Sequence, residues 1–144
     1  MNYCFAQVSD VPALCRLENA QPRAAHWGQD GWRTEIEDPS SCILCAQEEN
    51  EMVGFVALRL AVGVGEILNV AVAPSRCRQG VGQQLLSRAL HWVRERGGGE
   101  VTLEVGNTNF PAIRLYQKVG FVQVGVRKNF YHGNEDALIL KIKV

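Results

Sequence analysis

The sequence predicts an α+β fold: a mixed, mostly antiparallel sheet of about seven strands, with helices on both faces and one parallel β-α-β unit at its centre. Three observations predict it. Short apolar segments and segments of helical periodicity alternate in the order β-α-α-β-β-β-α-β-α-β-β. The stretch from Glu66 to Val105 has the pattern of a strand, a long helix and a strand, and a right-handed crossover of this kind makes its two strands parallel. The 144 residues contain no repeat or linker and suffice for one domain, 1–144.

The N-terminal part of the chain predicts one strand followed by two helices. The strand covers Tyr3 to Val8, and Ser9 is expected to cap a helix from about Asp10 to Asn19. The apolar residues of that helix share one face at helical spacing: Val11, Leu14, Cys15 and Leu17. A second helix from Gln29 to Glu37 ends before Pro39, because the residue preceding a proline disfavours helix.

The remaining elements follow from branched residues, glycines and periodicity. Strands are expected over Ile43–Gln47, Met52–Val62, Glu66–Val72, Glu100–Val105, Phe121–Val126 and Ala137–Ile142. The third of these is almost continuously apolar, which is typical of a strand covered on both faces. A long helix begins near Gly80 and stops at Gly97, and a shorter one covers Phe110–Val119 with Gly120 as its cap.

Composition excludes several classes of protein. Fifteen basic residues balance fifteen acidic ones, so no overall field favours nucleic acid or a membrane surface as a partner. The first residues do not resemble a signal peptide and no apolar run is long enough to span a membrane, which predicts a cytoplasmic protein. The residues carry no signal for an oligomeric state.

The cysteines and histidines predict no metal site. Five scattered cysteines suit a reducing compartment, and Cys42-Ile43-Leu44-Cys45 lies on an apolar strand, so these two thiols, and Cys4 and Cys15, are expected to be small buried hydrophobes. His26, His91 and His132 lack the spacing of metal ligands. His91 falls on the polar face of the long helix, where a solvated histidine is expected.

The most informative stretch runs from Val70 to Gln83. A buried strand leads into a short basic loop with glycines and then into a helix, whose first amides lack internal partners. Glycine lets an anion approach those amides, and Arg76 and Arg78 raise the local potential, so the stretch predicts a phosphate site. The third glycine of a dinucleotide-binding fingerprint is replaced by Leu85, and no nucleotide-hydrolysing loop motif occurs. The alternative is a glycine-rich helix start with two solvated arginines.

This stretch resembles the coenzyme A signature of the GNAT acetyltransferases, Q/R-x-x-G-x-G/A, in its residues Arg78-Gln79-Gly80-Val81-Gly82 after Asn69-Val70-Ala71-Val72. The segment from Glu104 to Phe121 is similar to that family's second signature. The tail Arg127-Lys128-Asn129-Phe130-Tyr131, with Glu135-Asp136-Ala137 after it, resembles the RimI-type group, which acetylates protein N-termini. The chain departs from the family in having Cys77 at the first signature position and Gly106-Asn107-Thr108-Asn109 where the RimI type commonly has Arg-Ala-Ser-Asn.

The resemblance implies a GNAT fold and acetyl-CoA as co-substrate. It implies that the two parallel strands separate beyond Asn69 and that the unpaired backbone of Val70, Ala71 and Val72 binds the acetyl-pantetheine arm. The pyrophosphate would be held by Arg78, Gln79, Gly80, Val81, Gly82 and Gln83. Asn109 would touch the cofactor, although it could instead be a plain helix cap.

Two catalytic residues are implied in the same way. Glu104 would be the general base, with a solvent-exposed strand-end glutamate as the alternative role and Glu66 as the rival base. Tyr116 would protonate the leaving thiolate, with a packed core aromatic as the alternative.

Tyr131 is the best single contact for the acceptor, together with other loop aromatics. The leading hypothesis is an N-acetyltransferase acting on a peptide or protein N-terminus by direct attack. The alternatives are a small-molecule amine acetyltransferase and a non-catalytic acyl-CoA-binding module.

Overall fold

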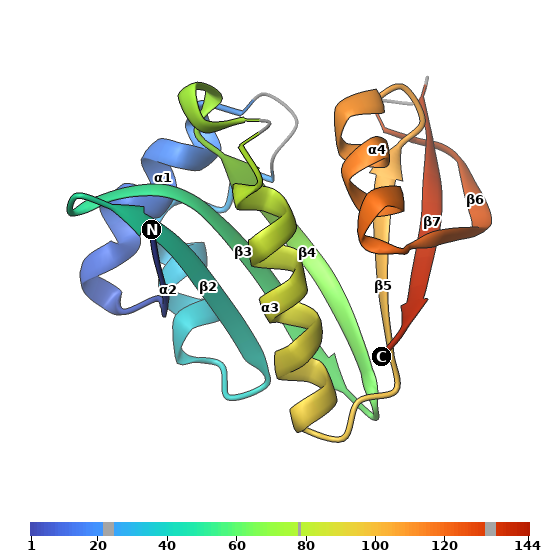
Figure 1. The fold of residues 1–144 in the computed structure, drawn as a ribbon, viewed down its shortest axis with the longest axis horizontal. Coiled ribbons are helices and arrows are strands. Elements are labelled where there is room, and N and C mark those ends of the chain that lie inside the picture. The colour runs from blue at the N-terminus through green and yellow to red at the C-terminus, as the bar shows by residue number, and fades with distance from the viewer. Residues whose placement is uncertain (22–24, 78, 132–134) are drawn as a thin grey trace.

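A computed structural model describes residues 1–21, 25–77, 79–131 and 135–144, apart from the side chains of residues 129–131. Its strands are β1 (Asn2–Phe5), β2 (Ser41–Glu48), β3 (Glu51–Ala61), β4 (Val64–Val72), β5 (Glu100–Gly106), β6 (Val122–Tyr131) and β7 (Glu135–Lys143). Its helices are α1 (Val11–Asn19), α2 (Gly28–Glu37), α3 (Val81–Glu95) and α4 (Phe110–Val119), with 3₁₀ turns η1 (Val8–Asp10) and η2 (Pro74–Arg76). The predicted order of strands and α-helices is confirmed (Figure 1).

The strands form one mixed sheet in the order β1-β2-β3-β4-β5-β7-β6. Only β4 and β5 pair in parallel among the described strands, and every other neighbouring pair is antiparallel. The connection through α3 makes a β-α-β crossover between these two neighbours, which is why they are parallel, and the pair lies at the centre of the sheet. The predicted fold class is therefore confirmed.

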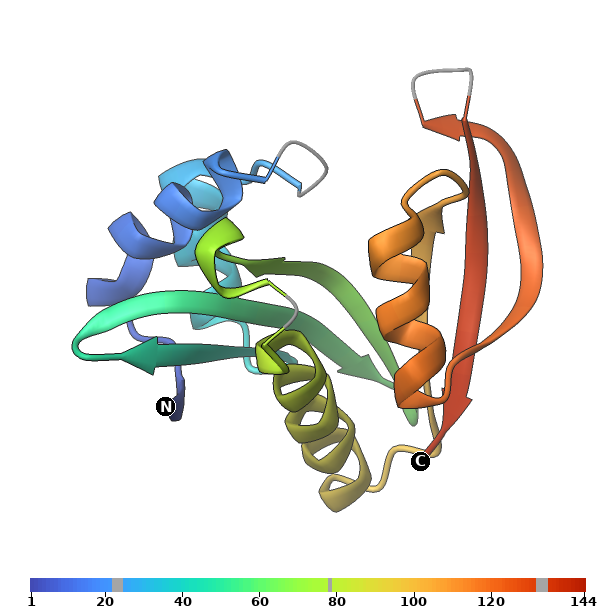
Figure 2. The ribbon, with the colours of Figure 1, turned by 45° about the horizontal axis from the view of Figure 1, so that its top comes forward.

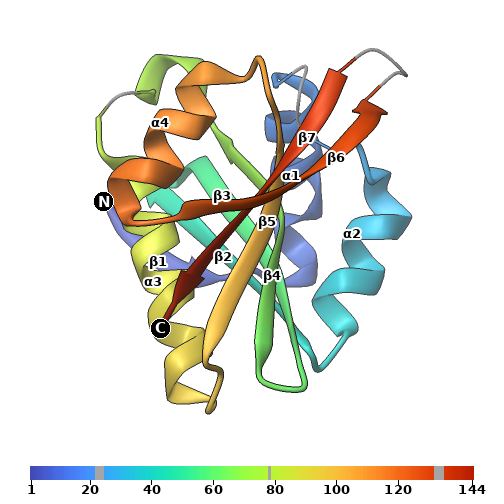
Figure 3. The same ribbon diagram turned by 90° about the vertical axis from the view of Figure 1, so that its right-hand side faces the viewer.

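Helices cover both faces of the sheet. Figure 3 shows α3 and α4 on one side and α1 and α2 on the other. The core beneath α3 and α4 includes Leu85, Leu86, Val101 and Leu103, and a second core beneath α1 and α2 is built around Trp32 and Phe55. The two rings of the second core meet edge to face with centroids 4.9 Å apart.

A β-bulge divides β4 into two halves. The pairing of β3 with β4 shifts between Ala57 and Leu58, so that Leu68 has no partner in the register. Ile67, before the bulge, packs in the core beneath α3, whereas Ala71, after it, packs beneath α1 and α2. The expectation that this strand is covered on both faces holds after the bulge, where Ala71 packs beneath α1 and α2 while Val70 and Val72 pack against the core beneath α3 and α4, but it fails at Glu66, which is exposed.

The N-terminal strand is shorter than expected. It ends at Phe5 instead of Val8 because the chain turns into η1, where the Gln7 N–H donates to Asp10 Oδ2 at 2.8 Å. Ser9 lies inside that turn and does not cap α1. At the other end of the chain β6 continues to Tyr131 instead of stopping at Val126, because it pairs with β7 as a long hairpin.

The cysteines fall into two groups. Burial is confirmed for Cys42 and Cys45, which point into the two separate cores on opposite faces of β2. Burial raises the pKa of the Cys42 thiol to about 12 and also raises that of Cys45. Cys4 was expected to be buried but is exposed, because β1 is an edge strand, and Cys15 is half-buried. No helix in the described part of the chain is long and apolar enough to cross a membrane.

Candidate active site

The two parallel strands separate along most of their length. Their pairing covers only three register pairs and stops at Glu66 and Thr102. Beyond that point residues 67–72 of β4 and 103–106 of β5 diverge, as Figures 1 and 2 show. We call this opening the fork. It begins three residues before Asn69, the expected point, because the bulge at Leu68 bends β4 while β5 stays paired with β7 throughout.

The register of β4 decides which backbone groups face the fork. The Ala73 N–H donates to the Val53 carbonyl at 2.8 Å, and antiparallel pairs alternate between hydrogen-bonded and non-bonded. Val72 and Val70 are therefore in non-bonded pairs, with their N–H and C=O groups directed away from β3 and into the fork. Those of Ala71 point toward β3. The expectation of unpaired backbone is thus corrected for Ala71.

The Val72 carbonyl already accepts a hydrogen bond within the protein. The Gln21 side chain, just past the end of α1, donates from Nε2 to the Val72 carbonyl at 2.7 Å. The Cys77 thiol also donates to this oxygen, with 3.7 Å between Sγ and O, so a ligand that bonds to the Val72 carbonyl would compete with these two donors.

Helix α3 begins beside the open end of the fork. Its N-cap, Gly80, adopts a left-handed conformation (φ 82°), makes no side-chain cap and is followed by a first turn without acidic residues. The amides of Val81, Gly82 and Gln83 therefore have no acceptor from a capping side chain and lie at the positive end of the helix dipole. This helix start suits a phosphate group, and a Cβ added to Gly80 would meet nothing within 4 Å.

The second glycine of the loop has a different role. Gly82 is buried, and a Cβ there would lie 2.9 Å from Leu115 Cδ2 on α4 and 3.7 Å from Val72 Cγ2 on β4. It permits close packing of α3, α4 and β4 where they converge. An incoming anion would therefore meet Gly80 and not the α-carbon of Gly82.

The polar side chains of the loop are only partly available. Arg76 forms an ion pair with Glu48 (Nε to Oε2, 2.9 Å), which offsets its charge. Gln79 is exposed and donates to the Ser75 carbonyl at 3.3 Å. Arg78 lies outside the described residues.

Glu104 lies on the face of β5 opposite to Leu103 and Val105, which are buried in the core beneath α3 and α4. Its side chain is 25% exposed and forms an ion pair with Arg127 of β6, with 2.7 Å between Oε1 and Nη2. Glu66, the rival base, is exposed at the closed end of the fork, opposite Thr102.

Tyr116 approaches from the opposite face. It lies on α4, is 9% exposed and packs edge to face against Phe121 with centroids 5.9 Å apart. It belongs to the core beneath α3 and α4. Glu104 and Tyr116 therefore flank β5 from its two faces. Asn109 is the N-cap of α4, but its side chain makes no capping hydrogen bond.

The connection between α1 and α2 is fixed to β4 by side chains that sequence reasoning missed. Glu18, only 1% exposed, accepts hydrogen bonds from the Trp27 and Gly28 N–H groups at 3.0 Å each. The buried Asn69 donates from Nδ2 to the Ala25 carbonyl at 3.1 Å. A glutamate at an apolar helical position was the only signal in the sequence for this arrangement.

Tyr131 and the histidines are the remaining candidate residues. The side chain of Tyr131 and all of His132 lie outside the described parts. His91 is exposed, as expected, and lies 2.7 Å from Glu95 (Nε2 to Oε1). Among the described residues, no group of three or more His, Cys, Asp or Glu side chains could hold a metal ion.

Comparison with known proteins gives a consistent picture. The family model of the acetyltransferase (GNAT) family matches residues 11–121. The ribosomal protein bS18-alanine N-acetyltransferase of Escherichia coli is 29% identical over 143 residues, covering 96% of this chain and 94% of that protein. An N-alpha-acetyltransferase of Sulfolobus acidocaldarius is 29% identical over 149 residues, covering 94% and 88%.

A solved structure and a third relative complete the comparison. The crystal structure of the Escherichia coli ribosomal-protein-S18-alanine N-acetyltransferase superposes with a TM-score of 0.90 at 25% identity, covering 99% of this chain and 93% of the other. A streptothricin acetyltransferase of Streptomyces lavendulae is 32% identical over 108 residues, covering 74% of this chain and 57% of that enzyme.

Proposed function

The chain belongs to the GNAT family of acetyltransferases and takes its acetyl group from acetyl-CoA; from this premise we propose that the acceptor is the α-amine of a protein N-terminus. The relatives that match nearly the whole chain carry names of N-terminal acetyltransferases. This similarity over nearly the whole chain is the observation that carries the acceptor, and the fork, where pairing of β4 and β5 ends at Glu66 and Thr102, supports the place of acetyl-CoA.

The fork and the start of α3 would together hold the cofactor. The amides of Val81, Gly82 and Gln83, with Gly80 permitting close approach, would bind the pyrophosphate. Arg78 and Gln79 would support it from the loop. The backbone groups of Val70 and Val72 face the fork, where an extended pantetheine arm could bond to them as an additional strand. Bound there, acetyl-CoA supplies an activated acetyl group, and Asn109 would contact it from the start of α4.

The two faces of β5 would carry the two proton transfers. Glu104 would accept the proton that the amine loses, directly or through one water, and Tyr116 would return a proton to the departing thiolate from the other face. A protein α-amine titrates near 7.7–8, so its deprotonation at pH 7 costs about 1 kcal/mol, against more than about 4 kcal/mol for a lysine side chain. A carboxylate is therefore a sufficient base for an N-terminus.

An acceptor panel tests the proposal. Purified protein and acetyl-CoA are incubated with a peptide bearing a free N-terminus, the same peptide with a blocked N-terminus and an internal lysine, and a polyamine, and the products are identified by mass spectrometry. We expect acetylation of the free α-amine only. Turnover confined to the polyamine would instead favour a small-molecule acceptor, the alternative raised by the relative that acts on streptothricin.

A further inference from the structure

The ion pair of Glu104 with Arg127 connects the candidate base to a strand that is not its neighbour. Glu104 is on β5 and Arg127 is on β6, with β7 between them. Arg127 is opposite Ala137 of β7, which is in turn opposite Gly106 of β5. Ala137 is fully buried and extends no further than its Cβ. The guanidinium can therefore reach across the middle strand to the carboxylate.

The ion pair restricts the side chain of Glu104, which has no paired strand on the β4 side of β5. Glu104 lies beyond the point where β4 stops pairing with β5, so no β4 residue is its register partner. A glutamate in such a position has several rotatable bonds, and a base that is misplaced by about 1 Å can lose about 100-fold in rate. Arg127 contacts Oε1 at 2.7 Å from the β6 side of β5, which is the side away from β4, and this contact fixes where the carboxylate lies. The other carboxylate oxygen keeps its capacity to accept a proton.

We propose that Arg127 is a positioning residue of the acetyl transfer: it holds the Glu104 carboxylate by one oxygen in a fixed place on β5. This inference rests on the proposed function, in which Glu104 is the base. Arg127 itself exchanges no proton.

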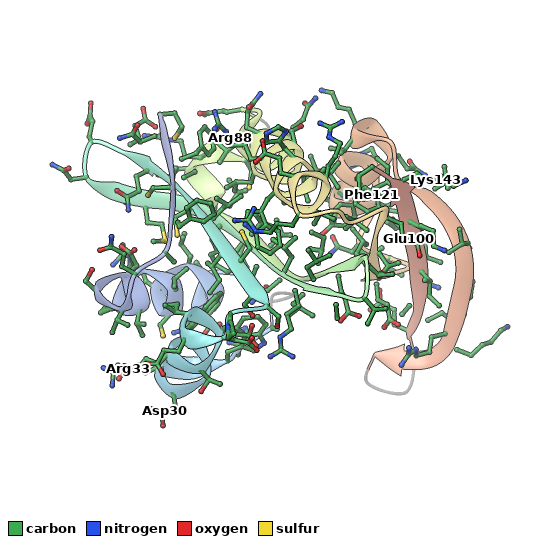
Figure 4. All side chains as sticks on the ribbon, turned by 90° about the horizontal axis from the view of Figure 1, so that it is seen from below. Asp30, Arg33, Arg88, Glu100, Phe121 and Lys143 are labelled. Carbon is green, nitrogen blue, oxygen red and sulfur yellow. The ribbon has the colours of Figure 1, made fainter. Side chains whose placement is uncertain are left out.

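A second ion pair provides a matched control. Lys141 of β7 and Glu100 of β5 lie 3.0 Å apart (Nζ to Oε2) on the face of the sheet that carries Glu104. Glu100 is at the closed end of the fork, in register with Val64 of β4 and with Lys143 of β7. Figure 4 labels Glu100 and Lys143, which lie close together in that view. The control pair joins two neighbouring strands, without a strand between them, and lies away from the opening.

The test compares Arg127→Met, Arg127→Lys and Lys141→Met in the otherwise unchanged protein, and Arg127→Met also in a Glu104→Gln background. Measured with a saturating peptide acceptor, kcat should fall about 10- to 100-fold in Arg127→Met, with a smaller loss in Arg127→Lys, and stay within about twofold in Lys141→Met. Acetyl-CoA affinity, measured by calorimetry, should stay unchanged throughout. In the Glu104→Gln background the arginine substitution should cause no further loss of kcat, because Arg127 acts through the carboxylate.

Two results overturn the proposal. One is an unchanged kcat in Arg127→Met, and the other is an equal loss in both backgrounds, which is what a general structural role produces. A normal kcat in Glu104→Gln alone is a different failure, because it removes the base assigned under the proposed function and the positioning role with it.

Discussion

The left-handed glycine that opens α3 allows a sharp test of the phosphate site. Gly80 has φ 82° and Gly97, just past the other end of the same helix, has φ 81°, and in both cases an added Cβ meets nothing within 4 Å. An L-residue in this conformation costs about 1–2 kcal/mol. Gly80→Ala and Gly97→Ala should therefore lower the free energy of unfolding by similar amounts, measured by urea denaturation.

Only Gly80→Ala should weaken the binding of acetyl-CoA. In the proposed site, a methyl group on Gly80 would stand where the pyrophosphate approaches the first amides of α3. Loss of one hydrogen bond to a charged group costs about 1.5–3 kcal/mol, which is a rise of about 10- to 150-fold in the Kd of acetyl-CoA. Titration calorimetry should find this rise in Gly80→Ala and an unchanged Kd in Gly97→Ala. Equal Kd values in the two variants would refute the assignment of this helix start.

Three further predictions concern other parts of the molecule. Glu104→Gln should lower kcat by about 100-fold or more while leaving acetyl-CoA affinity unchanged, and an unaffected rate would move the base to Glu66. Glu18→Ala removes the acceptor of the Trp27 and Gly28 N–H groups, so it should lower the free energy of unfolding by about 1.5–3 kcal/mol, against about 0.5 kcal/mol or less for the exposed Glu95→Ala. Because burial raises the pKa of Cys42 to about 12 and also raises that of Cys45, both thiols should resist Ellman's reagent at pH 8 until urea unfolds the protein, and rapid labelling of four or more thiols in the folded state would contradict this.

The sequence predicts the order of the elements because each depends on local patterns. The helix over Phe110–Val119 has the predicted limits, since a proline in its first turn and Gly120 after it are strong local signals. The length of β6 was not predictable in this way. Its second half begins with the polar residues Arg127, Lys128 and Asn129, which are poor strand signals, and this half is a strand because β7 is its partner.

The candidate site is likewise predictable only where its features depend on neighbouring residues. The glycine loop and Glu104 are recognisable from neighbouring residues, whereas the ion pair of Glu104 with Arg127 and the hydrogen bond of Gln21 to Val72 join segments that are far apart in sequence. The early separation of the strands depends on the bulge at Leu68, and one unpaired residue in an apolar run leaves no compositional signal.

That single unpaired residue has a wide effect on the strand that carries it. Removing it would turn every later side chain of β4 through half a rotation, bringing the amide of Asn69 toward the hydrocarbon beneath α3 and the isopropyl groups of Val70 and Val72 toward α1 and α2. The N–H and C=O groups that now point into the fork would then point toward β3, and those that now point toward β3 would point into the fork. One extra residue thus sets which core each later side chain of this strand enters and which of its peptide groups point into the fork.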